Sequence, residues 1–209
     1  MAFPVSNDSI LVFAKDGVIF HSEEVRQNVY EELFSDQPLH RNEIREYNIK
    51  SIGQPQLMKF MHICGNILKF PNPEEKVAHY TRLAEMYLNL KMKQAPLVQG
   101  VREFIQRHPD NTKFVCSEAK TDEIEAQLNY SNLWDEFEDV YGHPHAKKDV
   151  LFSIKGRYEE DIIFFGDSLK DWQAAQEAGV QFIGIDASPY VHPLRGEPIH
   201  IVASFDELM

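Results

Sequence analysis

The fold class is indicated by two stretches of sequence: Ser9-Ile-Leu-Val-Phe-Ala-Lys-Asp-Gly17 and Asp161-Ile-Ile-Phe-Phe-Gly-Asp-Ser-Leu-Lys-Asp171. Each starts with an unbroken run of branched and aromatic apolar residues and then passes into glycine and aspartate. Such a run is typical of a strand that is buried on both faces, as in a parallel sheet. Similar runs at residues 113–116 and 181–185, and a weaker one at 200–202, predict further strands.

Helical patterns separate these later strands. Apolar residues recur with helical spacing over residues 122–128, 147–154 and 169–178, and Gly179 is a typical helix stop. Strands that alternate with helices indicate an α/β fold with right-handed crossovers. We therefore expect a doubly wound parallel sheet.

The segment from residue 22 to 95 interrupts the alternation. It has no convincing strand, but residues 23–34, 41–50, 56–68 and 73–90 have helical patterns, and a further helix over 101–107 follows the segment. We expect a helical cap domain at residues 22–95, placed over the carboxyl edge of the sheet. Residues 1–21 and 96–209 would then form the α/β core.

Composition excludes several classes of protein. The chain has 209 residues, with 43% hydrophobic residues and a formal net charge of −12. Such a charge disfavours binding to nucleic acid or to an anionic membrane surface. No apolar run has membrane-spanning length, and residues 1–9 have neither the basic region nor the apolar stretch typical of a signal peptide, so we expect none. The two cysteines fit no metal-binding spacing. We expect a cytoplasmic protein, and the sequence leaves its oligomeric state open.

Polar residues gather where the strands end. Asp16 follows the first strand and Ser117 the second, and Asp167 and Asp171 follow the strand at 161–165, while Lys147 opens a helix. In open α/β sheets the ligand crevice lies at the carboxyl ends of the strands. Carboxylates, a hydroxyl and a lysine should therefore meet at one edge of one sheet.

In this order the residues resemble the motifs of the haloacid dehalogenase superfamily, and particularly its members that are similar to phosphoglycolate phosphatase and β-phosphoglucomutase. Those motifs are a strand ending in Asp-x-Asp-Gly, a strand ending in Ser or Thr, a Lys at a helix start, and a strand followed by Gly-Asp-Ser-x-x-Asp. The resemblance extends from Ile10 to Ile185. It implies a Rossmann-like core with an inserted helical cap, a Mg²⁺ cofactor and a small phosphorylated metabolite as substrate.

One residue departs from the pattern. The first motif reads Ala14-Lys15-Asp16-Gly17, and the family has its nucleophilic aspartate at the position of Ala14. That carboxylate takes the phosphoryl group as an aspartyl-phosphate and also binds Mg²⁺, whereas a methyl group does neither. Two explanations stay open: an engineered inactivating substitution and a natural pseudoenzyme. The other catalytic residues are all retained, which favours the first.

The resemblance implies roles for the remaining residues. Asp16 would be the general acid/base and would bind the metal through its carbonyl, and Asp167 would bind the metal directly. Asp171 would either support the metal ligands from behind or be a second metal carboxylate. Ser117 and Lys147 would hold the phosphoryl group, with Lys148 as the alternative lysine, and the backbone N–H groups of Lys15 and Asp16 would form an anion nest. The plain structural alternatives are an Asp-Gly turn for Asp16, a helix cap for Ser117, a first-turn helix acid for Asp171 and a solvated lysine.

Gln54 is the candidate specificity residue of the cap. It lies in Ile52-Gly53-Gln54-Pro55, between two helical patterns, where Gly53 allows a tight turn and Pro55 is expected to begin the next helix. We expect its amide to contact the non-reacting end of the substrate, although a plain helix–turn–helix connection explains the same residues.

Three functions remain open on sequence alone. The first is a Mg²⁺-dependent phosphatase of small phosphate monoesters, inactive here because of Ala14. The second is a natural pseudophosphatase that binds a phosphorylated ligand, and the third is a phosphomutase. A dehalogenase is disfavoured, because those relatives are metal-independent and residues 166–171 look like a metal site.

Overall fold

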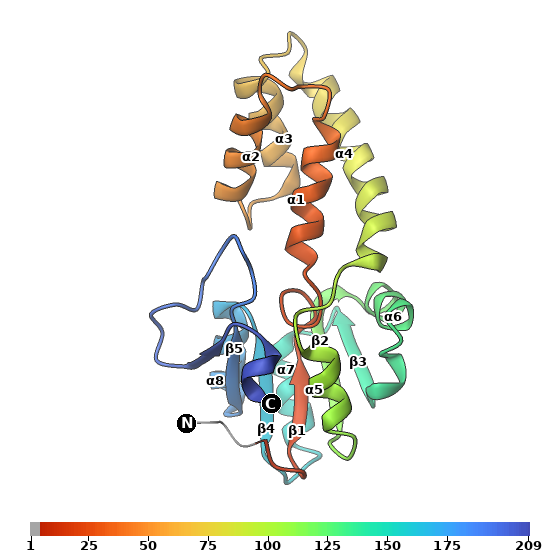
Figure 1. The fold of residues 1–209 in the computed structure, drawn as a ribbon, viewed down its shortest axis with the longest axis vertical. Helices are drawn as coiled ribbons and strands as arrows, with labels where there is room; N and C mark the ends of the chain where they lie inside the picture. The colour runs from red at the N-terminus through yellow and green to blue at the C-terminus, as the bar shows by residue number, and fades with distance from the viewer. Residues whose placement is uncertain (1–4) are drawn as a thin grey trace. The chain divides into compact units, whose positions relative to one another are not determined.

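A computed structural model describes residues 5–209 and divides the chain into two compact units. The residues up to Ser22, together with Lys93–Met209, form the α/β unit, and Glu23–Met92 form the helical unit. Figure 1 shows the strands in the first unit and only helices in the second. These boundaries lie one to three residues from those expected for core and cap.

The α/β unit is built on a six-stranded sheet in which every neighbouring pair is parallel, in the order β3-β2-β1-β4-β5-β6. This sheet confirms the predicted doubly wound fold. Its strands are β1 (Ile10–Phe13), β2 (Lys113–Lys120), β3 (Asp139–His143), β4 (Ile162–Gly166), β5 (Gln181–Ile185) and β6 (His200–Val202).

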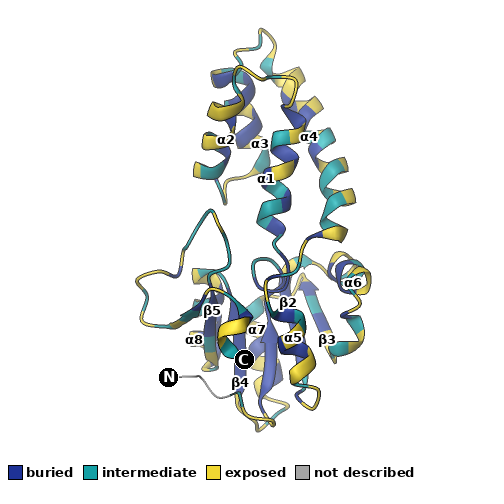
Figure 2. Cartoon of the chain, viewed as in Figure 1, coloured by how far each residue is buried: buried dark blue, intermediate teal, exposed yellow. Residues whose placement is uncertain are grey.

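Helices cover both faces of this sheet. α5 (Val101–Arg107) lies on one face with the 3₁₀ turn η4 (Phe205–Leu208), and α7 (Lys147–Lys155) lies beside α8 (Leu169–Ala178) on the other (Figure 1). α6 (Thr121–Tyr130) follows β2, and η3 (Trp134–Glu136) leads into β3. The Phe13 ring stacks on Phe165 of the neighbouring strand at 4.8 Å and contacts Phe104 of α5. β1 and β4 are therefore buried throughout, as Figure 2 shows in dark blue.

The helical unit has its own apolar core. Its helices are α1 (Ser22–Leu33), α2 (Arg41–Lys50), α3 (Gln56–His62), the π-helical turn η1 (Ile63–Ile67) and α4 (Pro73–Lys91), which runs into η2 (Met92–Gln94). Phe60 is fully buried, and its ring lies 5.1 Å from Tyr30 and 6.2 Å from Tyr80. Aromatic pairs at such separations stabilise a core beyond their buried area.

The structure corrects four details of the sequence reading. β3 was not predicted as a strand, because Asp-Val-Tyr-Gly-His is short, polar at both ends and at the sheet edge. β2 continues to Lys120, so Ser117 lies within a strand and not at its end. The helix expected over 56–68 changes into the π-helical turn at Ile63, and Pro55 is the N-cap of α3 and not its first residue.

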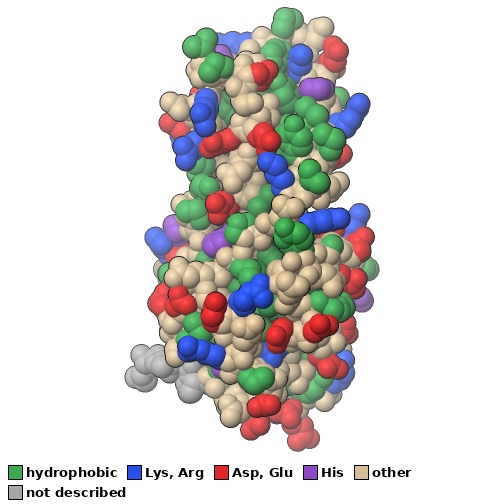
Figure 3. All heavy atoms as spheres, turned by 45° about the vertical axis from the view of Figure 1, so that its right-hand side comes forward, with side chains coloured by type: hydrophobic (Ala, Val, Ile, Leu, Met, Phe, Trp, Pro, Cys, Tyr) green, Lys and Arg blue, Asp and Glu red, His purple; other side chains and the backbone are tan. Residues whose placement is uncertain are grey.

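Charged side chains of both signs are scattered over the face of the molecule drawn in Figure 3. On the face drawn in Figure 3, acidic and basic groups are interspersed, and the basic ones do not join into one patch. Within residues 5–209, no helix has the length and apolar character that a membrane crossing requires.

Candidate active site

The candidate site lies between the carboxyl ends of β1 and β4. The sheet order reverses here, because β2 lies on one side of β1 and β4 on the other. Phe13 pairs with Phe165, and the N–H of Ala14 donates to the carbonyl of Phe165 at 2.9 Å. Ala14 is 1% exposed, so its methyl group is enclosed at the point where this α/β fold places ligands.

Asp167 lies directly against the turn that follows β1. A Cβ atom at Gly17 would collide with the Asp167 carboxylate, and Gly17 has a φ of +74°, which L side chains rarely adopt. Burial raises the pKa of Asp167 to about 7, and the nearby carboxylates of Asp171 and Asp16 add to the rise while Lys147 opposes it. Three acids, Asp16, Asp167 and Asp171, are matched by only two cations, Lys15 and Lys147, so the site favours further positive charge.

Asp171 is fully buried and held by three neighbours. Its Oδ1 lies 2.5 Å from the Nζ of Lys147, while its Oδ2 accepts from Ser168 Oγ at 2.8 Å and from the N–H of Asp167 at 3.3 Å. Ser168 caps α8, because its hydroxyl accepts from the N–H of Asp171. This network holds Lys147 at the strand ends, and both side-chain oxygens of Asp171 accept hydrogen bonds from the protein.

The two adjacent lysines have different surroundings. Burial lowers the pKa of Lys147, but the charge and hydrogen bond of Asp171, together with Cys116 and Asp167, raise it by more, so the pKa lies above its ordinary value and the ammonium stays charged. Lys148 is 53% exposed and pairs with Glu177 of α8 at 3.4 Å. Lys147 is therefore the lysine that the fold brings to the carboxylates.

Ser117 is buried at 3% exposure, one residue after Cys116, whose thiol lies close enough to Lys147 and Asp171 for both charges to affect its pKa. The Ser117 hydroxyl accepts from the N–H of Ala119 at 3.2 Å. The N-cap of α6 is Lys120, so Ser117 does not cap that helix. The hydroxyl hydrogen remains able to donate toward a phosphoryl oxygen.

Lys15 is turned into the protein. It is 4% exposed, and its Nζ donates to Oε1 of Gln127 at 2.8 Å and lies 3.2 Å from Oδ1 of Asp16. The side chain therefore holds the Asp16 carboxylate beside β1. The anion nest expected of the Lys15 and Asp16 backbone is not tested by these contacts.

The acidic residues fit an incomplete magnesium site. Mg²⁺ prefers hard oxygen ligands and keeps several waters. The pKa of Asp167 is raised first by burial and then by the neighbouring carboxylates, and a bound cation would offset both effects. Yet no three His, Cys, Asp or Glu side chains within residues 5–209 are grouped to hold a metal ion. Ala14 follows the strand β1 that pairs with β4, and its methyl group offers a cation no oxygen ligand.

Gln54 belongs to the helical unit. It is exposed in the turn before α3, its N–H donates to the carbonyl of Ser51 at 3.0 Å, and Gly53 has a φ of +87°. The turn therefore forms as expected. Gln54 also lines a pocket of about 390 Å³ within the helical unit.

Two residues of the network were missed by the sequence reading. Gln127 is 2% exposed and binds Lys15, and Ser168 locks Asp171 in place. A signal for Gln127 was present: it shares the buried face of α6 with Ile124 and Leu128. A polar residue in an apolar helical stripe needs a partner.

The comparisons with known proteins agree with this geometry. The family model described as haloacid dehalogenase-like hydrolase matches residues 11–185. The chain therefore belongs to the haloacid dehalogenase-like hydrolases. No curated protein sequence shows significant similarity to it.

Solved structures share the fold over nearly the whole chain. A haloacid dehalogenase family hydrolase from Deinococcus radiodurans R1, with bound phosphate and sodium, has 18% identity and a TM-score of 0.74, covering 98% of this chain and 94% of its own. A predicted phosphoglycolate phosphatase from Haemophilus somnus 129PT has 17% identity and a TM-score of 0.71, covering 98% of each chain. A haloacid dehalogenase-like hydrolase from Streptococcus pneumoniae has 16% identity and a TM-score of 0.68, also covering 98% of each.

Proposed function

We propose that this fold is built for Mg²⁺-dependent hydrolysis of a small phosphate monoester, and that Ala14 makes the present chain inactive. The observation that carries the proposal is the position of Ala14: enclosed at the end of β1, beside the carboxylates of Asp16 and Asp167. The family membership and the phosphate bound in the Deinococcus relative support it.

The chemistry follows from the residues once position 14 is an aspartate. That carboxylate would attack phosphorus and form an aspartyl-phosphate, while Asp16 protonates the leaving oxygen and then accepts a proton from the attacking water. The Ser117 hydroxyl and the Lys147 ammonium would hold phosphoryl oxygens, and Asp171 would keep Lys147 in place. Bound Mg²⁺, held by Asp167, the Asp16 carbonyl and the residue at 14, would supply charge neutralisation.

Restoring the nucleophile tests this proposal. Ala14→Asp should create Mg²⁺-dependent hydrolysis of an aryl phosphate, whereas the present chain should show none, because losing a covalent nucleophile costs on the order of 10⁴–10⁶ in turnover. Calorimetry should also show tighter Mg²⁺ binding by Ala14→Asp than by the present chain. A folded, magnesium-loaded Ala14→Asp protein that hydrolyses no ester in a broad metabolite panel would overturn the proposal.

A natural pseudophosphatase is the second candidate, and Ala14 itself is the observation that favours it. Such a protein would bind a phosphorylated ligand through Ser117 and Lys147 without turnover. An aspartate at position 14 of the natural gene would exclude it. A phosphomutase, the third candidate, would be recognised by transfer of phosphate between sugar phosphates in Ala14→Asp.

We further propose that Gln54 contacts the non-reacting end of the substrate. Its support is the exposed amide on a turn fixed by Gly53. In the Ala14→Asp background, Gln54→Ala should lower kcat/KM for the true substrate about ten-fold, or about 1.4 kcal/mol, and should leave a small aryl phosphate unaffected. Equal losses on both substrates would contradict a specificity role.

A cytoplasmic location and a small phosphorylated metabolite as partner complete the proposal. The location is supported by the two cysteines, which are both buried and free, as expected of a protein kept in a reducing compartment.

A further inference from the structure

The helical unit contains a pocket whose lining combines two cationic side chains with further hydrogen-bond donors. The pocket of about 390 Å³ is lined by α1, α3 and the turn at Gly53, with Arg26, Tyr30, Gln56 and Lys59 among its residues. Its volume is in the range of small-molecule sites. Gln54, proposed above to contact the substrate, also lines this pocket, whereas Asp16, Ser117 and Lys147 do not.

Lys59 is a buried cation without an acidic partner. It is 7% exposed, its Nζ donates to Oδ1 of Asn48 at 3.2 Å, and it lies 5.4 Å from the centre of the Tyr30 ring. Within residues 5–209, no carboxylate lies at ion-pair distance from this ammonium. A buried charge is costly unless it is paired, and an ammonium has three hydrogens to donate.

Two further donors in the pocket have no partner among the described residues. The Tyr30 hydroxyl and the Gln56 Nε2 are shielded from solvent and make no hydrogen bond there. Tyr30 is 5% exposed, and burial, followed by the charge of Glu23, raises the pKa of its hydroxyl, which therefore stays protonated. An unpaired buried donor costs about 1–3 kcal/mol, so an acceptor supplied by a ligand would stabilise both groups.

Positive charge prevails in this pocket although the chain as a whole is acidic. Arg26 and Lys59 contribute two positive charges against the single carboxylate of Glu23. That carboxylate already accepts from Nε2 of Gln27 at 2.7 Å and lies 3.8 Å from Arg26. The net charge of the chain is −12, so this local excess is not a general property of the surface.

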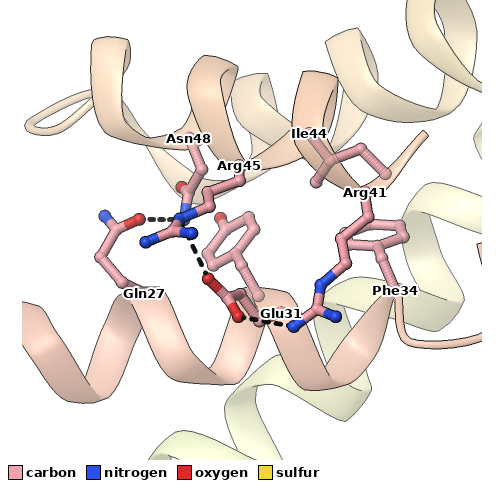
Figure 4. Close-up of a pocket in the computed structure, with 8 residues that line it drawn as sticks. Gln27, Glu31, Phe34, Arg41, Ile44, Arg45 and Asn48 are labelled. Carbon is pink, nitrogen blue, oxygen red and sulfur yellow. Dashed lines mark hydrogen bonds and ion pairs between the residues drawn. The ribbon is translucent and has the colours of Figure 1, made fainter. Parts of the chain in front are cut away.

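The two arginines of α2, unlike Lys59, have a carboxylate partner. In Figure 4 Arg41 and Arg45 of α2 both point at Glu31, each at 3.3 Å, while Gln27 bonds to Asn48. The Gln27–Asn48 bond leads on to Lys59, and this chain of neutral amides holds the ammonium in position without cancelling its charge.

We propose that this pocket binds an oxyanion, a carboxylate or phosphate group, of a small polar ligand. Lys59 and Arg26 supply the charge, and Tyr30 and Gln56 supply hydrogen bonds. The oxyanion belongs either to the substrate, an inference that rests on the proposed phosphatase function, or to a separate metabolite. In the first case the substrate class is a phosphate monoester with a second acidic group.

The test measures the binding of malonate and of inorganic phosphate to the present chain, by amide chemical shifts and by calorimetry. Malonate should shift amides around Tyr30 and Lys59, and Arg26→Gln and Lys59→Gln should each weaken its binding at least about ten-fold. Arg45→Gln is the matched control, 59% exposed on α2 and paired with Glu31, and should change nothing. Circular dichroism checks each fold, and Arg26→Gln, 40% exposed, is the safer variant if Lys59→Gln does not fold.

Each outcome decides the proposal. Equal affinity in all four proteins, or malonate shifts confined to the surroundings of Ser117, would overturn it, as would preference for a neutral or cationic probe.

A second experiment identifies the molecule that carries the oxyanion. It compares, in the Ala14→Asp background, aryl phosphates that carry or lack a carboxylate. If Arg26→Gln raises KM about ten-fold only for the carboxylate ester, the oxyanion is part of the substrate. If malonate binding is lost and both esters are unaffected, the ligand is a separate metabolite. An inactive Ala14→Asp protein would contradict the phosphatase proposal and leave the malonate result to decide this one.

Discussion

Lys147 and Lys148 are adjacent in sequence, yet their environments differ enough to make them a matched pair. Lys147 is 16% exposed and is the only ion-pair partner of the fully buried Asp171 within the described residues. Lys148 is 53% exposed beside Glu177, itself 57% exposed. A buried carboxylate that loses its cation is left in a medium that penalises charge, whereas an exposed pair is screened by water.

Lys147→Met should therefore lower the free energy of unfolding by about 3–5 kcal/mol. Lys148→Met should change it by less than about 1 kcal/mol. Urea unfolding at neutral pH measures both, with fluorescence of the two tryptophans as the signal. Equal effects of the two substitutions would show that Asp171 has another source of stabilisation.

At the scale of elements, the site depends on how α8 begins. Ser168 accepts from the N–H of Asp171 and donates to its Oδ2, so one hydroxyl both caps the helix and satisfies the carboxylate. Ser168→Ala should cost about 1–2 kcal/mol of stability, since a typical cap is worth about 1 kcal/mol and a buried acceptor also loses its donor. Ser153→Ala, at an exposed position on α7, is the control and should lie within about 0.5 kcal/mol of the parent. Thermal unfolding followed by circular dichroism compares them, and a Ser168→Ala protein as stable as the control would mean that water replaces the hydroxyl.

The elements also show what the sequence could predict and what it could not. α5, α8 and α2 have the predicted bounds, because apolar periodicity and a stop at Gly179 are local signals. β3 was missed, because an edge strand needs few apolar residues and takes its order from pairing with β2. The acidic residues were predicted from motif order, but the binding of Lys15 to Gln127 was not, because it joins residues far apart in the chain. Two donors of the helical unit's pocket lie on α1 and two on α3, and no local pattern connects one pair with the other.

At the scale of the whole molecule, each unit carries one reporter of its own opening. Cys64 lies in the core of the helical unit and Cys116 in β2 of the α/β unit, and both are fully buried. Burial raises the pKa of Cys64 to about 11, with Lys76 opposing, and that of Cys116 to about 12. An ordinary thiol has a pKa near about 8.5, so at pH 8 an exposed cysteine reacts readily while either native cysteine presents almost no thiolate. Labelling at pH 8 therefore measures how often each unit opens.

We expect the two cysteines to react at different rates. The helical unit spans Glu23–Met92, and a domain of that size buries a smaller fraction of its surface than a larger one and is less stable for it. In mild denaturant a thiol reagent should therefore modify Cys64 faster than Cys116, as measured in the single variants Cys116→Ala and Cys64→Ala with a matched stability check on each. Raising the pH from 7 to 8 should speed both reactions about 8-fold if reclosing is faster than labelling, because the thiolate fraction of an exposed cysteine rises by that factor below its pKa. Rates that do not change with pH would mean that opening itself limits the labelling. Identical rates for both cysteines at every denaturant concentration would mean that the units unfold as one, and fast labelling of either cysteine without denaturant would contradict its burial.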